Sequence, residues 1–315
     1  MEQNQAALLS ETRIKRIRKL LFLVFILILL SLYIMNASKP GLFVEGCPDG
    51  CVITVEPGTG PLRIVSLNML HGFPRFTNLQ LRLDLIATEI RRLNADVVLL
   101  QEVPWVRGTG NAAEVVAQKL GYNYIYYRAN GNRNLILFEE GEAILSRYPL
   151  SKVVFTELQP QAGFFESRVT LGASAVTPWG ELFFYVAHLT DKNPKVNEGQ
   201  AEELRSFVES HTNGLAIVAG DFNAREDSPQ ILRLASVWTD TYRVAHPEDA
   251  GLTCCIDELK ANPGELLEER IDYIFLVHET GKIISVEHVF NHPFKIRDGW
   301  QWASDHTGLM VEIEP

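Results

Sequence analysis

The sequence is poor in the features of small, irregular or repetitive proteins. It has only four cysteines in 315 residues, which excludes a disulfide-dense scaffold. It contains no repeat of fixed period and no low-complexity segment, so a solenoid and a disordered chain are both excluded. The 46% of hydrophobic and 22% of charged residues are typical of a folded globular protein.

Positive charge is scarce over most of the chain. The first 39 residues hold six basic and two acidic groups. The whole chain has a net charge of −10, so residues 40–315 carry a net charge of −14. Non-specific binding to a polyanion depends on Lys and Arg that neutralise phosphates. The composition therefore argues against a non-specific nucleic-acid binder, although it leaves a local basic cleft open.

One long hydrophobic run stands near the N-terminus. Residues 20–38 are uncharged and are preceded by the basic string RIKRIRK. About 20 apolar residues cross a bilayer, and flanking basic residues stay on the cytoplasmic side. We expect a basic cytoplasmic segment (1–19), a transmembrane signal anchor (20–38), a stalk (39–60) and an extracytoplasmic domain (61–315). The alternative is a cleaved signal peptide, which would release the same domain as a secreted protein.

The cysteines form two close pairs. Cys47 and Cys51 flank Pro-Asp-Gly, a turn that brings them near enough to pair after export. Cys254 and Cys255 are adjacent, and a bridge between neighbours is strained and uncommon. We favour structural or free thiols for these cysteines, and neither pair has the spacing of a zinc site.

Residues 61–315 alternate between strand and helix patterns. Helical spacing covers 78–93, 112–120, 194–211 and 228–235. Strand patterns cover 62–68, 96–103, 122–127, 134–138, 142–146, 151–158, 167–177, 181–189, 215–219, 270–277, 282–290 and 308–313. Consecutive strands in the middle argue against a doubly wound parallel sheet. Two mixed sheets packed face to face, with helices outside, fit better.

Polar residues that carry chemistry stand at the ends of these apolar strands. They are Asn68, Glu102, His188, Asp221, Asn223, Asp272, Asp305 and His306. Carboxylates and histidines beside a core are costly unless they are paired or bind an ion. Each residue alone has an ordinary structural explanation, but their joint occurrence predicts a catalytic rim.

The motifs around these residues resemble a known family. SLNML, LLQEV, AILSRYPL, AHL, GDFNA, RIDYIF and SDH occur in the order found in the endonuclease/exonuclease/phosphatase superfamily, the DNase I-like metal-dependent phosphoesterases. The resemblance spans residues 61–315. It implies an α/β fold, a four-layer sandwich of two mixed β-sheets flanked by helices, here preceded by one transmembrane helix.

The resemblance also implies roles for single residues. Glu102 corresponds to the glutamate that holds a divalent ion, with Asn68 and Asp305 at the same metal site and Asn68 also near the phosphate. The ion expected is Mg²⁺, or Mn²⁺ in its place, since hard cations prefer oxygen ligands. Asp221 and Asn223 correspond to the pair that positions water and phosphate.

Further roles concern the histidines and a cation. His306 corresponds to the histidine that works with the attacking water, and Asp272 to the carboxylate that orients it. His188 corresponds to a second histidine that donates to the phosphate or leaving group. Glu142 falls where some members place a partner for that histidine, and Arg168 where nucleases place a phosphate-binding arginine.

Departures from the family pattern narrow the function. Leu70 stands where abasic-site endonucleases carry an aspartate, and the string after Glu102 differs from that of bacterial sphingomyelinases. We expect a membrane-anchored phosphoesterase for a lipid headgroup, nucleic acid or small phosphate ester, and no protein partner. The alternatives are a DNase-like nuclease and a silent binding module. Trp300 and Trp302, beside the SDH motif, either line a substrate pocket or only pack.

Overall fold

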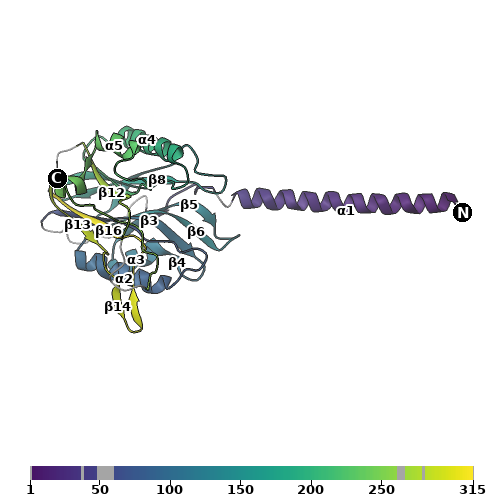
Figure 1. The fold of residues 1–315 in the computed structure, drawn as a ribbon, viewed down its shortest axis with the longest axis horizontal. Coiled ribbons are helices and arrows are strands. Elements are labelled where there is room, and N and C mark those ends of the chain that lie inside the picture. The colour runs from purple at the N-terminus through teal and green to yellow at the C-terminus, as the bar shows by residue number, and fades with distance from the viewer. Residues whose placement is uncertain (1, 37–38, 48–59, 261–266, 279–280, 315) are drawn as a thin grey trace.

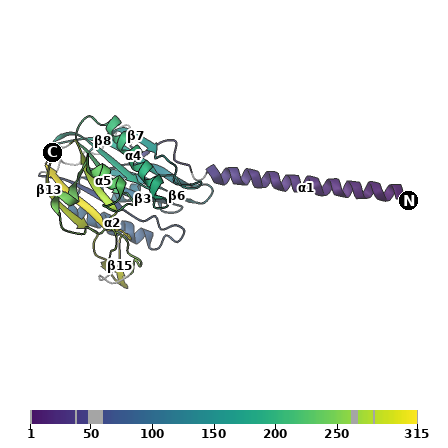
Figure 2. The same cartoon turned by 45° about the horizontal axis from the view of Figure 1, so that its top comes forward.

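The computed structural model describes residues 2–36, 39–47, 60–260, 267–278 and 281–314. The pairing of Cys47 with Cys51 that the sequence allows therefore involves a residue outside the described part. Figures 1 and 2 show a long helix, α1, that projects from a body of two sheets with helices on the outside. The helices are α1 (Glu2–Asn36), α2 (Leu79–Leu93), α3 (Ala112–Leu120), α4 (Pro194–His211), α5 (Pro229–Ala235) and α6 (Thr241–Ala245).

The first sheet has eight strands, in the order β1-β5-β6-β3-β2-β16-β13, with β4 paired to β3. Its strands are β1 (Glu45–Gly46), β2 (Leu62–Asn68), β3 (Val97–Val106), β4 (Gly110–Asn111), β5 (Asn123–Asn132), β6 (Phe138–Ser146), β13 (Lys282–Val289) and β16 (Gly308–Glu314). Only β2 and β3 among the neighbours in this sheet run parallel, so the sheet is mixed.

The second sheet has six strands, in the order β11-β12-β10-β9-β8-β7. Its strands are β7 (Leu150–Glu157), β8 (Val169–Thr177), β9 (Gly180–His188), β10 (Ala216–Asp221), β11 (Thr239–Asp240) and β12 (Asp272–Val277). It is also mixed, since β9 and β10 are parallel and β10 and β12 antiparallel. A separate hairpin joins β14 (Phe294–Ile296) to β15 (Gly299–Gln301).

Each sheet is buried on both faces, against the other sheet on one face and against helices on the other, which gives four layers. In β3, Val97 and Leu99 join the cluster between the sheets, whereas Val98 and Leu100 join the cluster under α2 and α3. In β10, alternate residues likewise face the other sheet or the helices α4 and α5. Successive side chains of a strand point to opposite faces, so a strand buried on both sides is apolar throughout. The predicted four-layer fold is confirmed.

Most predicted elements are present, with one wrong strand. Residues 134–137 form a turn, and Phe138 starts β6, so the strand expected over 134–138 is wrong. The apolar string Leu135-Ile136-Leu137 misled the prediction, because these residues sit at the tip of the β5–β6 hairpin. A short leading strand was expected within residues 40–60, and β1 lies there. The short pieces β4, β11, β14, β15 and α6 were not foreseen, since two to five residues give no periodic signal.

The N-terminal helix is long and apolar enough to cross a membrane. Its segment Arg13–Ile34 has 22 residues, and every side chain in it is exposed rather than packed against the body. Exposure of so many apolar residues to water is unfavourable. The helix is therefore a candidate membrane span, in agreement with the hydrophobic run in the sequence.

Candidate active site

Strand direction gathers the polar residues at one edge of each sheet. In the second sheet Asp221 pairs with His188 of parallel β9 and with Asp272 of antiparallel β12. The ends of β9 and β10 and the start of β12 therefore meet. In the first sheet, Asn68 at the end of β2 pairs with Gln101 of parallel β3, so Glu102 follows beside it.

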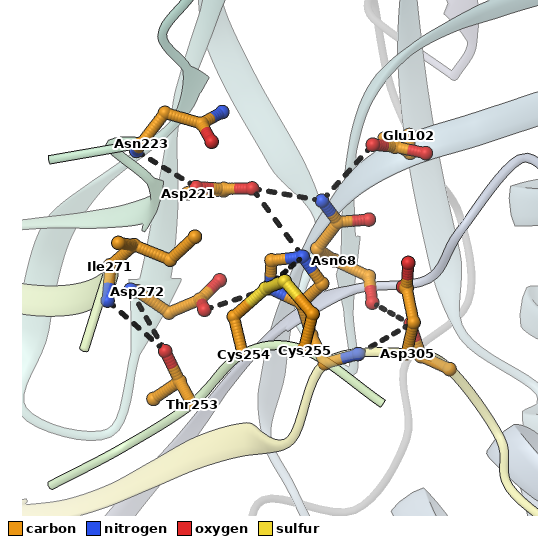
Figure 3. The surroundings of a disulfide bond; sticks show 12 residues. Asn68, Glu102, Asp221, Asn223, Thr253, Cys254, Cys255, Ile271, Asp272 and Asp305 are labelled. Atoms are coloured by element: carbon orange, nitrogen blue, oxygen red, sulfur yellow. Dashed lines mark hydrogen bonds and ion pairs between the residues drawn. A yellow bond between two sulfur atoms is a disulfide. The ribbon is translucent and has the colours of Figure 1, made fainter. Parts of the chain in front are cut away.

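Asn68 joins the two sheets across the core. Its Nδ2 donates to Asp221 Oδ2 at 3.0 Å and lies 3.3 Å from Glu102 Oε1, as Figure 3 shows. The side chain is 1% exposed, and its oxygen accepts a hydrogen bond from the amide of Leu70. Through this one amide Glu102 of the first sheet and Asp221 of the second sheet form a single site.

Gly220 makes the approach of β9 and β10 possible at this point. A Cβ at this position would collide with the carbonyl oxygen of Ala187. A residue without a side chain is therefore required immediately before Asp221. Asn223, two residues later, has a positive φ of 47°, and its amide donates to Asp221 Oδ1 at 2.9 Å. The GDFN string thus fixes the direction of the Asp221 carboxylate.

His306 and two aspartates form a buried triad. His306 Nδ1 lies 2.9 Å from Asp272 Oδ2, and Nε2 lies 3.8 Å from Asp221 Oδ2. Burial alone would lower the pKa of His306, but the charges of Asp272 and Asp221 outweigh it and raise the pKa well above its ordinary value. Burial, together with the charge of Asp272, raises the pKa of Asp221 to about 7. The triad can hold a proton.

His188 occupies the other side of Asp221. Its Nε2 lies 3.0 Å from Asn223 Nδ2, and its Nδ1 lies 2.9 Å from Arg168 Nη1. Burial and the positive charge of Arg168 lower the pKa of His188 well below its ordinary value, so the imidazole is neutral. Arg168 also forms an ion pair of 2.9 Å with Glu166.

Glu142 is buried on β6, and its predicted role as a partner of His188 stays a prediction. Among the described residues, the hydrogen bonds of His188 go to Arg168 and Asn223 and not to Glu142. Glu142 is 1% exposed, and its Oε2 has no hydrogen-bond partner there. Burial, together with the charge of Glu140, raises its pKa well above the ordinary value. The residue is therefore a buried acid.

Glu102 stands at a β-bulge and faces a cleft. The pairing of β3 with β6 shifts register between Leu100 and Val103, and Glu102 has a φ of 54°. Its Oε2 accepts from the amide of His71 at 3.1 Å. Burial would raise the pKa of Glu102, but His71 and the hydrogen bonds lower it, so the group is ionised.

The donor set fits a hard divalent cation. Glu102, Asp221, Asp272 and Asp305 offer carboxylate oxygens, which Mg²⁺ and Mn²⁺ prefer. Asp272 Oδ1 is buried without a hydrogen-bond partner among the described residues. Ligand atoms of Asp221, Asp272 and His306 lie within 4.8 Å of one another. The predicted ligands Asn68 and Glu102 are in contact. Burial, together with the charge of Glu102, raises the pKa of the predicted ligand Asp305.

Three residues that support the site carry no sequence signal strong enough to predict them. His71 contacts Glu102 with Nε2 to Oε2 at 3.5 Å. Arg82 is 1% exposed and donates to the carbonyl oxygens of Met69, Leu70 and Ala303. Thr253 Oγ1 accepts from the amides of Ile271 and Asp272, both at 3.2 Å. An arginine within a helical pattern is predicted to be exposed. The burial of Arg82 and its hydrogen bonds to the backbone around the site are therefore seen only in the structure.

The adjacent cysteines form a disulfide close to the triad. Figure 3 shows the bond between Cys254 and Cys255. Cys254 Sγ lies 3.5 Å from His306 Nε2. The sequence left the pairing of these two cysteines open, because bridges between neighbours are uncommon. The loop is held on both sides: Cys254 bonds to Glu269, and Ile256 to Asp305.

The two tryptophans do not line the cleft. Trp302 is 4% exposed, and its backbone amide bonds to Leu259. A cleft of about 540 Å³ is instead lined by His71, Phe73, Glu102, Asn130, Phe138, Glu140, Gly163, Phe164, Phe165, Glu166, Arg168, Asp191 and Lys192. Three of its aromatic residues, Phe73, Phe164 and Phe165, lie on loops, which have no periodicity that a sequence pattern reveals, and Phe138 is the first residue of β6.

Two sheets that place histidines, carboxylates and amides at a common edge define a hydrolase site of the DNase I-like type. Residues 65–306 match the endonuclease/exonuclease/phosphatase family, and this chain belongs to that family, whose members are hydrolases of phosphate esters. A comparison with curated proteins finds no match.

Solved structures share the fold at low sequence identity. A family protein from Leptotrichia buccalis is 21% identical, with a TM-score of 0.63, over 81% of this chain and 100% of that one. A mannosyl-6-phosphatase from Bacteroides thetaiotaomicron is 18% identical, with a TM-score of 0.66, over 81% and 100%. Truncated TDP2 from Caenorhabditis elegans is 18% identical, with a TM-score of 0.60, over 81% and 97%. These likenesses concern the fold alone.

Proposed function

We propose that this protein is a membrane-anchored phosphoesterase that hydrolyses a phosphodiester or phosphomonoester with Mg²⁺ or Mn²⁺. The observation that carries the proposal is the contact of Asn68 Nδ2 with Asp221 Oδ2 at 3.0 Å. It unites the ionised Glu102 with the Asp221, Asp272 and His306 triad in one site. α1 would be the anchor, with the N-terminus in the cytoplasm and the catalytic domain outside.

The divalent ion would be held by Glu102, with Asn68 and Asp305 beside it, and would neutralise charge on the phosphate oxygens. Asp221 and Asn223 position a water molecule in line with the ester bond. His306 takes a proton from this water at Nε2, while Asp272 holds the Nδ1–H. The water oxygen bonds to phosphorus as the bond to the leaving alcohol breaks.

His188, Asn223 and Arg168 face the charge that develops on the phosphate. The neutral imidazole of His188 and the amide of Asn223 donate hydrogen bonds to the phosphate oxygens, and the guanidinium of Arg168 adds positive charge. Arg168 is held by Glu166, so the charge is positioned before substrate binds. Preorganised donors of this kind stabilise a transition state without reorganisation.

A turnover assay tests this proposal. The full-length chain in detergent micelles is treated with EDTA and then given Mg²⁺, Mn²⁺ or Ca²⁺, with bis-p-nitrophenyl phosphate and p-nitrophenyl phosphate as substrates. We expect hydrolysis of at least one substrate that EDTA abolishes and Mg²⁺ or Mn²⁺ restores. Hydrolysis that survives EDTA, or no hydrolysis with any ion, would contradict the proposal.

A further inference from the structure

Exposed apolar side chains gather at the mouth of the active-site cleft. Phe164 is 62% exposed, Phe165 57%, Phe73 45% and Ile136 43%. Phe73, Phe164 and Phe165 line the cleft that contains Glu102 and Arg168. We call these four side chains the apolar rim. Contiguous exposed apolar residues around a polar site are typical of an interaction surface.

The apolar rim continues to the N-terminal helix. A second hollow of about 430 Å³ is lined by Leu30 and Ile34 of α1 and by body residues that include Phe73, Phe165 and Ile136. Phe73 and Phe165 line both hollows. Figures 1 and 2 agree, since in both views α1 leaves the body on the side of β6. The cleft mouth and the end of the candidate span therefore share one surface.

The length of the candidate span indicates how deep in a bilayer this surface lies. The uncharged part of α1 follows the basic segment 13–19 and runs from Leu20 to the end of the helix at Asn36. At about 1.5 Å per residue this part spans about 26 Å, close to the ~30 Å of a hydrocarbon core. Ile34 lies about 3 Å from the outer end of the helix, and Leu30 lies about 6 Å deeper. Side chains beside these two residues lie at the boundary between headgroups and acyl chains, where aromatic and aliphatic side chains are favoured.

The net charge of the body favours docking on a lipid surface without net charge. Residues 40–315 carry a net charge of −14, which repels an anionic surface or a nucleic acid. A zwitterionic lipid surface carries no net charge and meets the apolar rim without this repulsion. The cleft beside the rim offers Arg168 and Lys192 at its polar side.

We infer that the apolar rim docks on the outer surface of the bilayer in which α1 is anchored, and that the cleft takes the phosphate ester of a zwitterionic phospholipid from it. The inference rests on the proposed function for its catalytic step and on α1 as the anchor. Phe73 and Phe165, which line both hollows, connect the lipid surface to the site.

Fluorescence quenching tests the docking without depending on activity. Full-length protein with Ile136→Trp is reconstituted in phosphatidylcholine vesicles that contain dibrominated phosphatidylcholine. The control is Leu232→Trp on α5, where the native side chain is 57% exposed and lines neither hollow. We expect the added Ile136→Trp emission to be quenched about twofold more strongly than that of the control, since bromine quenches only tryptophan at the acyl chains. Equal quenching in the two variants would overturn the docking and point to a soluble partner for the rim.

Turnover tests the substrate. Ile136→Asp and the control Leu232→Asp are compared on phosphatidylcholine vesicles and on soluble bis-p-nitrophenyl phosphate. Ile136 lies outside the cleft lining, so we expect Ile136→Asp to lose about tenfold of its vesicle turnover and to keep its soluble turnover. Leu232→Asp should keep both.

The outcomes separate the two claims. Soluble turnover without turnover of the vesicle lipid would overturn the substrate inference and leave the proposed function standing. Equal vesicle turnover in Ile136→Asp and Leu232→Asp would overturn the role of the rim. Absence of metal-dependent turnover on both substrates would contradict the proposed function, while the quenching result still decides the docking.

Discussion

Replacing Asp272 by asparagine removes a carboxylate charge from His306 with little change in shape. Asp272 Oδ2 lies 2.9 Å from His306 Nδ1, and both side chains are buried. A hydrogen bond to a charged group contributes about 1.5–3 kcal/mol. If this contribution is realised when His306 gains its proton in the transition state, kcat/KM falls by about 10- to 160-fold.

The same change moves the pH profile in a defined direction. The carboxylates keep the pKa of His306 well above its ordinary value, so the imidazolium persists to higher pH. A general base must be neutral, and turnover should therefore rise as pH increases through this raised pKa. Asp272→Asn removes a charge that favours the imidazolium, so the rise should begin at lower pH.

The assay follows bis-p-nitrophenyl phosphate hydrolysis across pH at saturating metal. The control is Asp84→Asn on α2, an aspartate that is 48% exposed and paired with Lys119. Asp84→Asn should leave both the rate and the profile unchanged. Wild-type kcat/KM in Asp272→Asn, or a rise that shifts to higher pH, would refute the reasoning about this pair.

The other predictions concern metal affinity, the buried side chain of Arg82 and the core. Glu102→Gln should raise the Mg²⁺ concentration for half-maximal activity by about 10- to 100-fold, and an unchanged metal titration would argue against a ligand role. Arg82→Leu leaves four carbonyl oxygens, those of Met69, Leu70, Thr77 and Ala303, without their donor. The free energy of unfolding should therefore fall by about 3 kcal/mol in urea denaturation, and a change under about 1 kcal/mol would contradict a stabilising role of these hydrogen bonds. Leu99→Ala opens a cavity between the sheets at a fully buried position, and calorimetry should record a loss of about 2–5 kcal/mol, whereas no loss would contradict the packing.

The sequence predicted the fold because strands buried on both faces have a strong pattern. Residues 62–68, 112–120 and 194–211 form the expected strand and helices with the expected bounds. The motif residues Asp221, Asp272 and His306 lie together because they stand at strand ends that the topology aligns.

What the sequence could not supply depends on contacts between distant loops. The buried position of Arg82, the bond of Thr253 to the Asp272 amide and the place of Phe164 and Phe165 on the cleft all require the third dimension. The burial of Glu142 and the disulfide between Cys254 and Cys255 likewise depend on their surroundings in the fold.

The most direct test of the account is the turnover of His306→Ala beside that of His211→Ala. His211 is an exposed histidine at the end of α4. His306→Ala therefore removes a histidine from the site, and His211→Ala removes one from the surface. Both should retain the wild-type circular dichroism spectrum. We expect Mg²⁺-dependent hydrolysis of bis-p-nitrophenyl phosphate to fall by about 10²- to 10⁴-fold in His306→Ala and to stay unchanged in His211→Ala. Equal turnover in the two folded variants would contradict a hydrolytic site built on His306.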